Sequence, residues 1–177
     1  MLTIGSSTIL ARIIAALDLP EIAISANGDP VRFAAFGRPV LGDGRFTGEG
    51  PLAGLLAGLD WAFLIGATAL LTVPGDTPFV PRGLAATLLP PPACAVSHGR
   101  VHHLVALWPV DARIPLRDWL SRPGARNVEK FAQMIGVRRV DFPLATWDSF
   151  LNVNTPADLA MARSQADQTA TEGRALG

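Results

Sequence analysis

This sequence is short of several residue types on which common architectures depend. It contains a single cysteine, Cys94, among 177 residues, so no disulfide can form within the chain and no multi-cysteine metal site can be built. Fifteen lysine and arginine residues balance fifteen aspartate and glutamate residues. A chain without net charge has no overall field to hold nucleic acid or an acidic membrane. We therefore expect a small-molecule partner and a reducing, cytoplasmic location.

Long apolar runs are also missing. No stretch offers about eighteen uninterrupted apolar residues, the length that a membrane-spanning helix needs. The first ten residues, MLTIGSSTIL, lack the basic start and long apolar segment of a secretion signal. With 49% hydrophobic residues, the chain is large enough to bury one full core. The sequence predicts a soluble protein with one main domain.

Helix-like and strand-like segments alternate along the chain. Residues 7–18 place apolar side chains at helical spacing, with Ser7 or Thr8 available as the N-cap. Residues 21–26 are short and β-branched, which is typical of a strand. The apolar run at residues 67–73, ATALLTV, has the pattern of a central parallel strand covered on both faces.

The same alternation continues to the end and predicts an α/β class with three layers and a mostly parallel sheet. An antiparallel pair is expected where ACAVSH and HHLVALW follow each other closely. We expect a domain over residues 1–162 and a frayed or disordered tail over residues 163–177, where apolar residues become scarce. Further helices are expected in residues 81–89, 112–122, 127–136 and from Thr155, and further strands in residues 38–43 and 137–142.

Polar side chains stand where three of these strands end. Asn27 and Asp43 follow the first two strands, and Asp76 follows the most apolar one within the motif PGDTP. Ligands of open α/β sheets bind beyond the carboxyl ends of strands, and a carboxylate there suits a divalent cation. The alternative for Asp76 is structural: it caps a helix that begins near Pro81, or it orders the turn through its own backbone.

Two other segments are open to both interpretations. The glycine-rich stretch GEGPLAG at residues 48–54 precedes a helix and can meet an anion with its amides or serve only as a turn. In NVNTPADL, Thr155 and Pro156 are a good start for a helix, while Asn152 and Asn154 are not explained by capping. The three histidines have no zinc-site spacing.

GPLAG, PGDTPFVP, HHLVALW and FLNVNTPADL occur in this order along nearly the whole chain. This set resembles the molybdenum cofactor guanylyltransferases, the MobA family of the nucleotidyltransferase superfamily, whose sheet is Rossmann-like. The resemblance implies transfer of GMP from GTP to molybdopterin, with release of pyrophosphate and with Mg²⁺ as the cofactor. GTP, the molybdenum cofactor and other cofactor-delivery proteins are the partners that it implies.

The resemblance also implies roles for the strand-end residues. Asp76 matches the family's Mg²⁺-binding aspartate, which also meets the nucleotide, and we expect it to be catalytic. Asp43 matches an acidic residue that contacts GTP. Asn27 matches an asparagine that faces the nucleotide, although an ungapped alignment places Ser25 there. No specific duty is carried over to the two asparagines of NVNTP.

One departure from the family pattern concerns the start of the chain. Members begin with a first strand and a glycine-rich loop, LAGGxSxRMGxDK, which wraps the phosphates and supplies an arginine and a lysine. This sequence starts after that segment, and its one lysine is Lys130. We expect either a true start upstream of Met1 or a truncated enzyme whose first strand is missing, and the activity of the chain as it stands is then in doubt.

Two alternatives to guanylyl transfer follow. Cytidylyl transfer to the same cofactor, or nucleotidyl transfer to a sugar phosphate, belongs to the same enzyme class, and competition between GTP and CTP separates them. A non-catalytic protein that keeps the fold and only binds the cofactor is the alternative from another class. It predicts binding without release of pyrophosphate.

Overall fold

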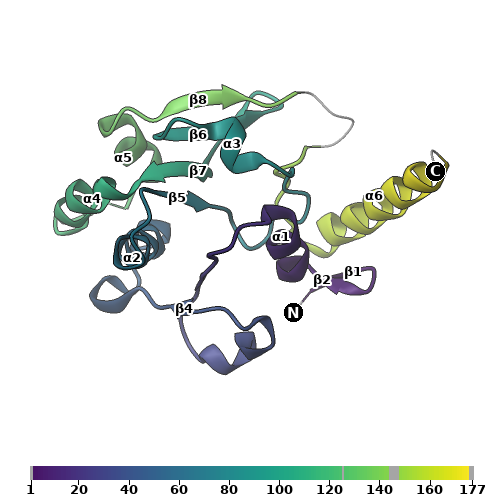
Figure 1. Cartoon of the computed structure of the whole chain (residues 1–177), viewed down its shortest axis with the longest axis horizontal. Coiled ribbons are helices and arrows are strands. Elements are labelled where there is room, and N and C mark those ends of the chain that lie inside the picture. The colour runs from purple at the N-terminus through teal and green to yellow at the C-terminus, as the bar shows by residue number, and fades with distance from the viewer. Residues whose placement is uncertain (1, 125, 144–147, 176–177) are drawn as a thin grey trace. The chain divides into compact units, whose positions relative to one another are not determined.

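The computed structural model describes residues 2–124, 126–143 and 148–175. The chain divides into two compact units, which we describe separately. The terminal unit comprises Met1–Asp18, Pro74–Leu84 and Leu144–Gly177, and the sheet unit comprises Leu19–Val73 and Ala85–Pro143. Figure 1 labels the helices and strands.

A four-stranded sheet in the order β5, β7, β6, β8 is the centre of the sheet unit (Figure 1). Strand β7 is antiparallel to both β5 and β6, and β8 is parallel to β6, so three of the four strands run in one direction. The predicted α/β class with a mostly parallel sheet is confirmed, as is the antiparallel pair. The strands are β5 (Ala69–Thr72), β6 (Ala93–Ser97), β7 (Arg100–Pro109) and β8 (Arg138–Asp141).

The prediction that residues 67–73 form a central strand covered on both faces was wrong for the described residues. There, β5 is the edge strand of the four-stranded sheet, and all four of its residues are half-buried. An apolar run shows that a strand has apolar neighbours, but it does not fix how many strands pair with it. The neighbour here is a helix: a Cβ on Gly58 would lie 2.9 Å from the Cδ2 atom of Leu70.

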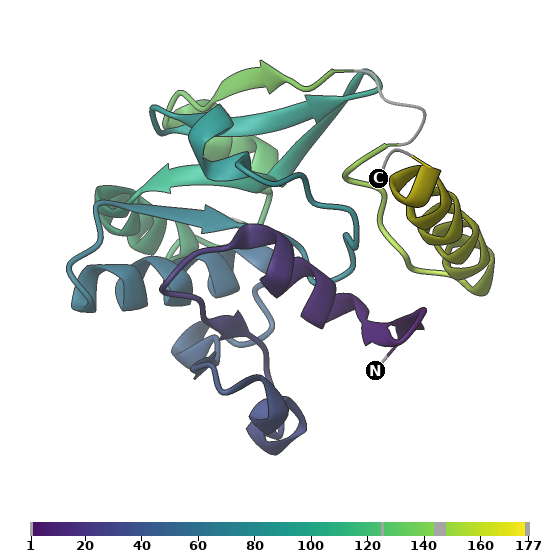
Figure 2. The same ribbon diagram turned by 45° about the vertical axis from the view of Figure 1, so that its right-hand side comes forward.

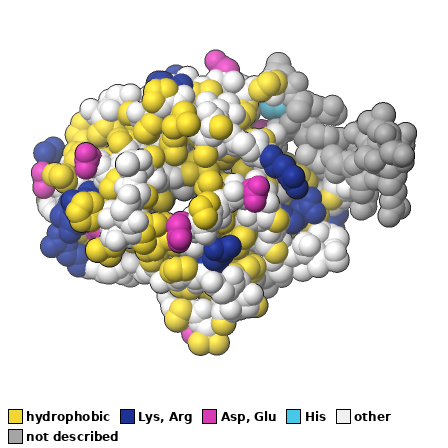
Figure 3. Space-filling view, viewed as in Figure 1, with side chains coloured by type: hydrophobic (Ala, Val, Ile, Leu, Met, Phe, Trp, Pro, Cys, Tyr) yellow, Lys and Arg dark blue, Asp and Glu magenta, His cyan; other side chains and the backbone are white. Residues whose placement is uncertain are grey.

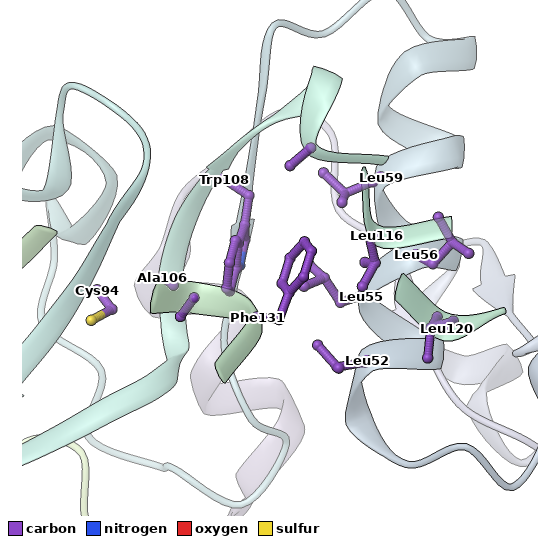
Figure 4. Packing of buried hydrophobic residues seen from close by; sticks show 12 residues of the cluster. Leu52, Leu55, Leu56, Leu59, Cys94, Ala106, Trp108, Leu116, Leu120 and Phe131 are labelled. Carbon is purple, nitrogen blue, oxygen red and sulfur yellow. The ribbon is translucent and has the colours of Figure 1, made fainter. Parts of the chain in front are cut away.

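Helices α2 (Pro51–Leu64), α4 (Arg113–Leu120) and α5 (Val128–Met134) contribute with β6 and β7 to one hydrophobic core. Trp108 and Phe131 lie at its centre with ring centroids 6.2 Å apart (Figure 4). The indole N–H of Trp108 donates to Thr72 Oγ1 at 2.9 Å, so this buried polar atom is satisfied. The core side chains labelled in Figure 4 are nearly inaccessible: Leu52, Leu55, Leu56, Leu59, Cys94, Ala106, Trp108, Leu116, Leu120 and Phe131.

A second, two-stranded sheet lies in the same unit. Strand β3 (Ile24–Ser25) pairs in parallel with β4 (Val40–Leu41), which confirms both predicted strands in shorter form. Figure 2 shows this part beside α2. Short helices complete the unit: η1 (Pro30–Phe36), η2 (Gly44–Phe46), η3 (Val110–Ala112) and α3 (Leu84–Leu88), which begins at the border with the terminal unit.

The terminal unit combines a hairpin of β1 (Thr3–Ile4) and β2 (Ser7–Thr8) with α1 (Ile9–Leu17) and α6 (Pro156–Ala175). Thr8 Oγ1 accepts the amide of Ala11 at 3.1 Å, which confirms the predicted N-cap. The guanidinium of Arg163 on α6 donates to the Thr3 carbonyl at 3.2 Å. The helix from Thr155 is confirmed, and the boundary at residue 162 stays a prediction.

Acidic side chains lie singly over the face shown in Figure 3, in keeping with the balanced charge of the sequence. Within the described residues, no helix combines the length and the apolar character needed to cross a membrane.

Candidate functional site

The predicted nucleotide-binding residues Asn27 and Asp43 lie together. Each follows its strand, β3 or β4, by two residues, and parallel strands bring their carboxyl ends to the same edge. The Asn27 amide Nδ2 donates to Asp43 Oδ2 at 2.6 Å, and the backbone N–H of Asp43 donates to Asn27 Oδ1 at 3.1 Å. Both ends of the amide are thus used, which fixes its orientation.

The start of α2 lies against this pair. A Cβ on Gly54 would lie 2.6 Å from Ser25 Oγ and 3.6 Å from Asp43 Oδ1, so the first turn approaches as closely as it does because residue 54 is glycine. Ser25 and Asn27, the two candidates for the nucleotide-facing position, therefore both lie near Asp43. The sequence motif GEGPLAG contains Gly54, but spacing alone did not single it out.

Helix α2 begins at Pro51 after Gly50, and no side chain caps its first turn. The amides of an uncapped first turn have no partners within the helix and attract anions. The preceding glycine-rich loop is held from outside: the Arg126 guanidinium donates to both carboxylate oxygens of Glu49, at 2.6 and 3.0 Å. This pairing lowers the pKa of Glu49.

Asp76 lies in the terminal unit and is half-buried. Burial raises the pKa of Asp76 above its ordinary value, and the polar groups of its own backbone and of Asn152 oppose this by lowering the pKa. The Oδ1 atom is buried and has no hydrogen-bond partner among the described residues. An unsatisfied buried carboxylate oxygen is costly, and a divalent cation is the partner that it fits.

Thr77 holds the turn around Asp76. The backbone N–H and the hydroxyl of buried Thr77 both donate to the Pro74 carbonyl, at 3.4 and 2.8 Å. Helix α3 begins only at Leu84, so the alternative that Asp76 caps a helix near Pro81 was wrong. The alternative that Asp76 orders the turn through its own backbone stays a prediction.

The NVNTP segment joins Asp76 to α6 within the terminal unit. The backbone N–H of Val153 donates to the Asp76 carbonyl at 2.8 Å. Thr155 and Asp158 form a reciprocal cap: Asp158 N donates to Thr155 Oγ1 at 3.1 Å, and Thr155 N donates to Asp158 Oδ2 at 2.8 Å. The predicted cap is confirmed, and these bonds lower the pKa of Asp158.

The structure therefore brings Asn27 and Asp43 together in the sheet unit and places Asp76 beside Asn152 in the terminal unit. Within the described residues, no group of three histidine, cysteine, aspartate or glutamate side chains can hold a metal. His102 shares a hydrogen bond of 2.8 Å with Ser97.

The sequence matches the MobA-like NTP transferase domain family over residues 1–137. The chain belongs to this family. A molybdenum cofactor guanylyltransferase of Acidiphilium cryptum is 56% identical over 143 residues, which cover 81% of this chain and 72% of the relative. A protein of the same name from Cereibacter sphaeroides is 51% identical over 148 residues, covering 81% and 74%.

The fold of MobA-like proteins agrees with this assignment. The molybdopterin-guanine dinucleotide biosynthesis protein A of Archaeoglobus fulgidus superposes with a TM-score of 0.68 at 17% identity, covering 94% of this chain and 89% of that one. The expected family is confirmed, and the chain is a nucleotidyltransferase. Proteins of the family generally use a divalent metal. The particular residue roles stay predictions.

Proposed function

We propose that this protein transfers GMP from GTP to the molybdenum cofactor, forming the guanine dinucleotide cofactor and pyrophosphate. The identity of 56% to a molybdenum cofactor guanylyltransferase supports this most strongly. The contact of Asn27 with Asp43 beyond the strand ends and the buried, unpaired Oδ1 atom of Asp76 support it further. GTP and molybdopterin are then the substrates, in the cytoplasm, with other cofactor-delivery proteins as partners.

The reaction is an in-line displacement at the α-phosphorus of GTP. A terminal phosphate oxygen of the cofactor forms the new P–O bond, the bond to the bridging β-phosphate oxygen breaks, and pyrophosphate leaves. The protein contributes by positioning and by charge stabilisation. Asn27 and Asp43 bind the nucleotide, and Asp43 keeps acceptor capacity beyond its bond to Asn27 because a carboxylate offers about four lone-pair sites. The guanine amino group is a matching donor.

We assign Mg²⁺ to Asp76. The buried, unpaired Oδ1 suits a hard cation that takes one or two carboxylates and completes its octahedron with water and phosphate oxygens. When bound, Mg²⁺ neutralises charge on the phosphate oxygens. Partial burial of Asp76 keeps bulk water from competing for the same carboxylate.

Pyrophosphate release by the full chain tests the proposal, with purified molybdopterin and either GTP or CTP. We expect release that requires the cofactor, GTP and Mg²⁺ together. Release with CTP in place of GTP would replace guanylyl by cytidylyl transfer. Cofactor binding without release under any nucleotide would contradict the enzymatic proposal and favour a binding protein.

A further inference from the structure

Arg12 on α1 holds a hydrogen-bond donor for which the described part of the chain supplies no acceptor. Its neighbours Ile9 and Ile13 are 5% and 3% exposed, so this part of α1 is seated in the terminal unit. The Arg12 Nε atom is itself buried and has no hydrogen-bond partner among the described residues. A buried N–H group without a partner costs free energy, and a ligand that accepts from it removes that cost.

The guanidinium of Arg12 lies over an aromatic ring. Its Cζ atom is 5.7 Å from the centre of the Phe79 ring, a distance at which the face of a ring attracts a cation. This attraction acts on the charge and uses no hydrogen bond, so the N–H groups of the guanidinium remain donors for another partner. Phe79 thus holds Arg12 in place without satisfying it.

Phe79 and Asp76 belong to the same short segment. They are three residues apart in the sequence, which limits the distance between their Cα atoms to about 11 Å. Figures 1 and 2 both show α1 beside this segment, and all of it belongs to the terminal unit. The Asp76 Oδ1 atom is also buried without a partner among the described residues. One unpaired donor and one unpaired acceptor of opposite charge therefore share this region and are not bonded to each other.

A phosphate group with a divalent cation satisfies both atoms. Phosphate oxygens accept from the planar fork of an arginine, and Mg²⁺ takes carboxylate and phosphate oxygens together. We propose that Arg12 binds a phosphate group of a substrate beside the cation held by Asp76. This inference rests on the proposed function in taking Asp76 as the cation-binding residue. The nucleotide and the cofactor both offer such a phosphate group.

Arg113 provides a matched control in the sheet unit. Its Cζ atom is 3.9 Å from the centre of the Phe63 ring, and its Nε atom is likewise buried without a partner among the described residues. Within those residues, however, the one buried carboxylate oxygen without a partner belongs to Asp76, in the other unit. Arg12→Gln and Arg113→Gln remove the same charge from the same kind of contact. Their comparison separates a phosphate site from a general loss of positive charge.

Calorimetric titration of the full chain tests the inference. Inorganic pyrophosphate with Mg²⁺ is the probe for the nucleotide, and molybdopterin is the probe for the cofactor. We expect Arg12→Gln to weaken the binding of one of these probes about tenfold or more, which identifies the substrate, and Arg113→Gln to weaken neither. Arg12→Lys keeps the charge without the planar fork and should bind that probe with intermediate affinity. The thermal midpoint of each variant reports whether the fold is kept.

The outcomes distinguish this inference from the proposed function. If Arg12→Gln binds both probes as the unchanged protein does, and the unchanged protein transfers GMP, Arg12 binds no phosphate and the proposed function remains. Equal losses in Arg12→Gln and Arg113→Gln would also overturn the inference, since they show a general effect of charge. If Arg12→Gln does not fold, full affinity of Arg12→Lys for both probes overturns it. Probe binding that depends on Arg12 in a chain that transfers no GMP would keep the phosphate site and remove the proposed function.

Discussion

Asn27 and Asp43 hold each other through two hydrogen bonds of opposite direction, one from the amide to the carboxylate and one from the Asp43 backbone to the amide oxygen. Neither residue belongs to a strand, yet each is fixed relative to the end of one. The pair joins β3 and β4 beyond their ladder, so it is a rigid polar edge on which a nucleotide can be bound.

Replacing the amide by a carboxylate tests this edge. Asn27→Asp removes the donor to Asp43 and sets two negative charges against each other. We expect GTP affinity to fall about tenfold or more, measured by calorimetric titration. Asp29→Asn, which changes a nearby charge outside the pair, is the control. Equal GTP affinity in Asn27→Asp would show that the pair does not bind nucleotide.

Gly54 offers a test of packing. Glycine to alanine inside a helix normally stabilises by about 0.5–1 kcal/mol, but a Cβ here would lie 2.6 Å from Ser25 Oγ. Gly54→Ala should therefore lower the thermal midpoint and weaken GTP binding.

The partner variant for this clash is Ser25→Ala. With the hydroxyl gone, the nearest atoms to an alanine Cβ are at 3.6 and 3.7 Å, an ordinary contact. The double variant Ser25→Ala, Gly54→Ala should regain the thermal midpoint that Gly54→Ala loses. Additive losses in the double variant would mean that the hydroxyl is not the obstacle.

Asp76→Asn should end nucleotidyl transfer and yet not destabilise the protein. Burial raises the Asp76 pKa above the ordinary 3.8, so the folded state binds the proton more tightly than the unfolded state does. The stabilisation that this tighter proton binding gives the folded protein is fully present below pH 3.8. It is lost as pH rises through the folded-state pKa of Asp76. An asparagine at position 76 does not titrate, so the variant does not lose stability as the pH rises.

The measurement is the thermal midpoint as a function of pH in the presence of a chelator. At neutral pH, Asp76→Asn should melt no lower than the unchanged protein, and the difference should shrink as pH falls toward 3.8, the ordinary value. If Asp76→Asn melts clearly lower at neutral pH, the claim that the buried charge of Asp76 destabilises the folded protein is wrong.

The Glu49–Arg126 pair should have a small effect that depends on salt. Arg126 is exposed and Glu49 is partly exposed, and ion pairs near the surface are screened by ions. Arg126 lowers the Glu49 pKa below 4.5, so the pair stabilises above that pH and ceases to do so as pH falls through the lowered pKa. We expect Glu49→Gln to lower the thermal midpoint slightly at low salt and not at 1 M salt. A salt-independent loss would point to another role of Glu49.

The sequence predicted the elements well where periodicity and caps agreed. The helix after Thr8 and the helix after Thr155 were both located by their N-cap residues, because capping is a local interaction. The edge position of β5 in the sheet was not predicted, since the pairing of strands depends on partners distant in sequence. The close approach of Gly54 to Ser25 was missed for the same reason.

The candidate site was predicted in part. Strand-end position and family resemblance both pointed to Asn27 and Asp43, and the structure shows that the two side chains are in contact. Asp76 was named from its motif, but the unpaired Oδ1 atom depends on side-chain geometry that no spacing rule contains. The nucleotide- and metal-binding roles of all three residues stay predictions.

The bond from the Val153 amide to the Asp76 carbonyl joins two segments that lie far apart in the chain. Its proton is exchanged with solvent only when the two segments separate. The rate of deuterium uptake at this single amide therefore measures how often the loop that carries Asp76 opens. A substrate or cation that slows its exchange reports that the loop has been held closed, even where no product is formed.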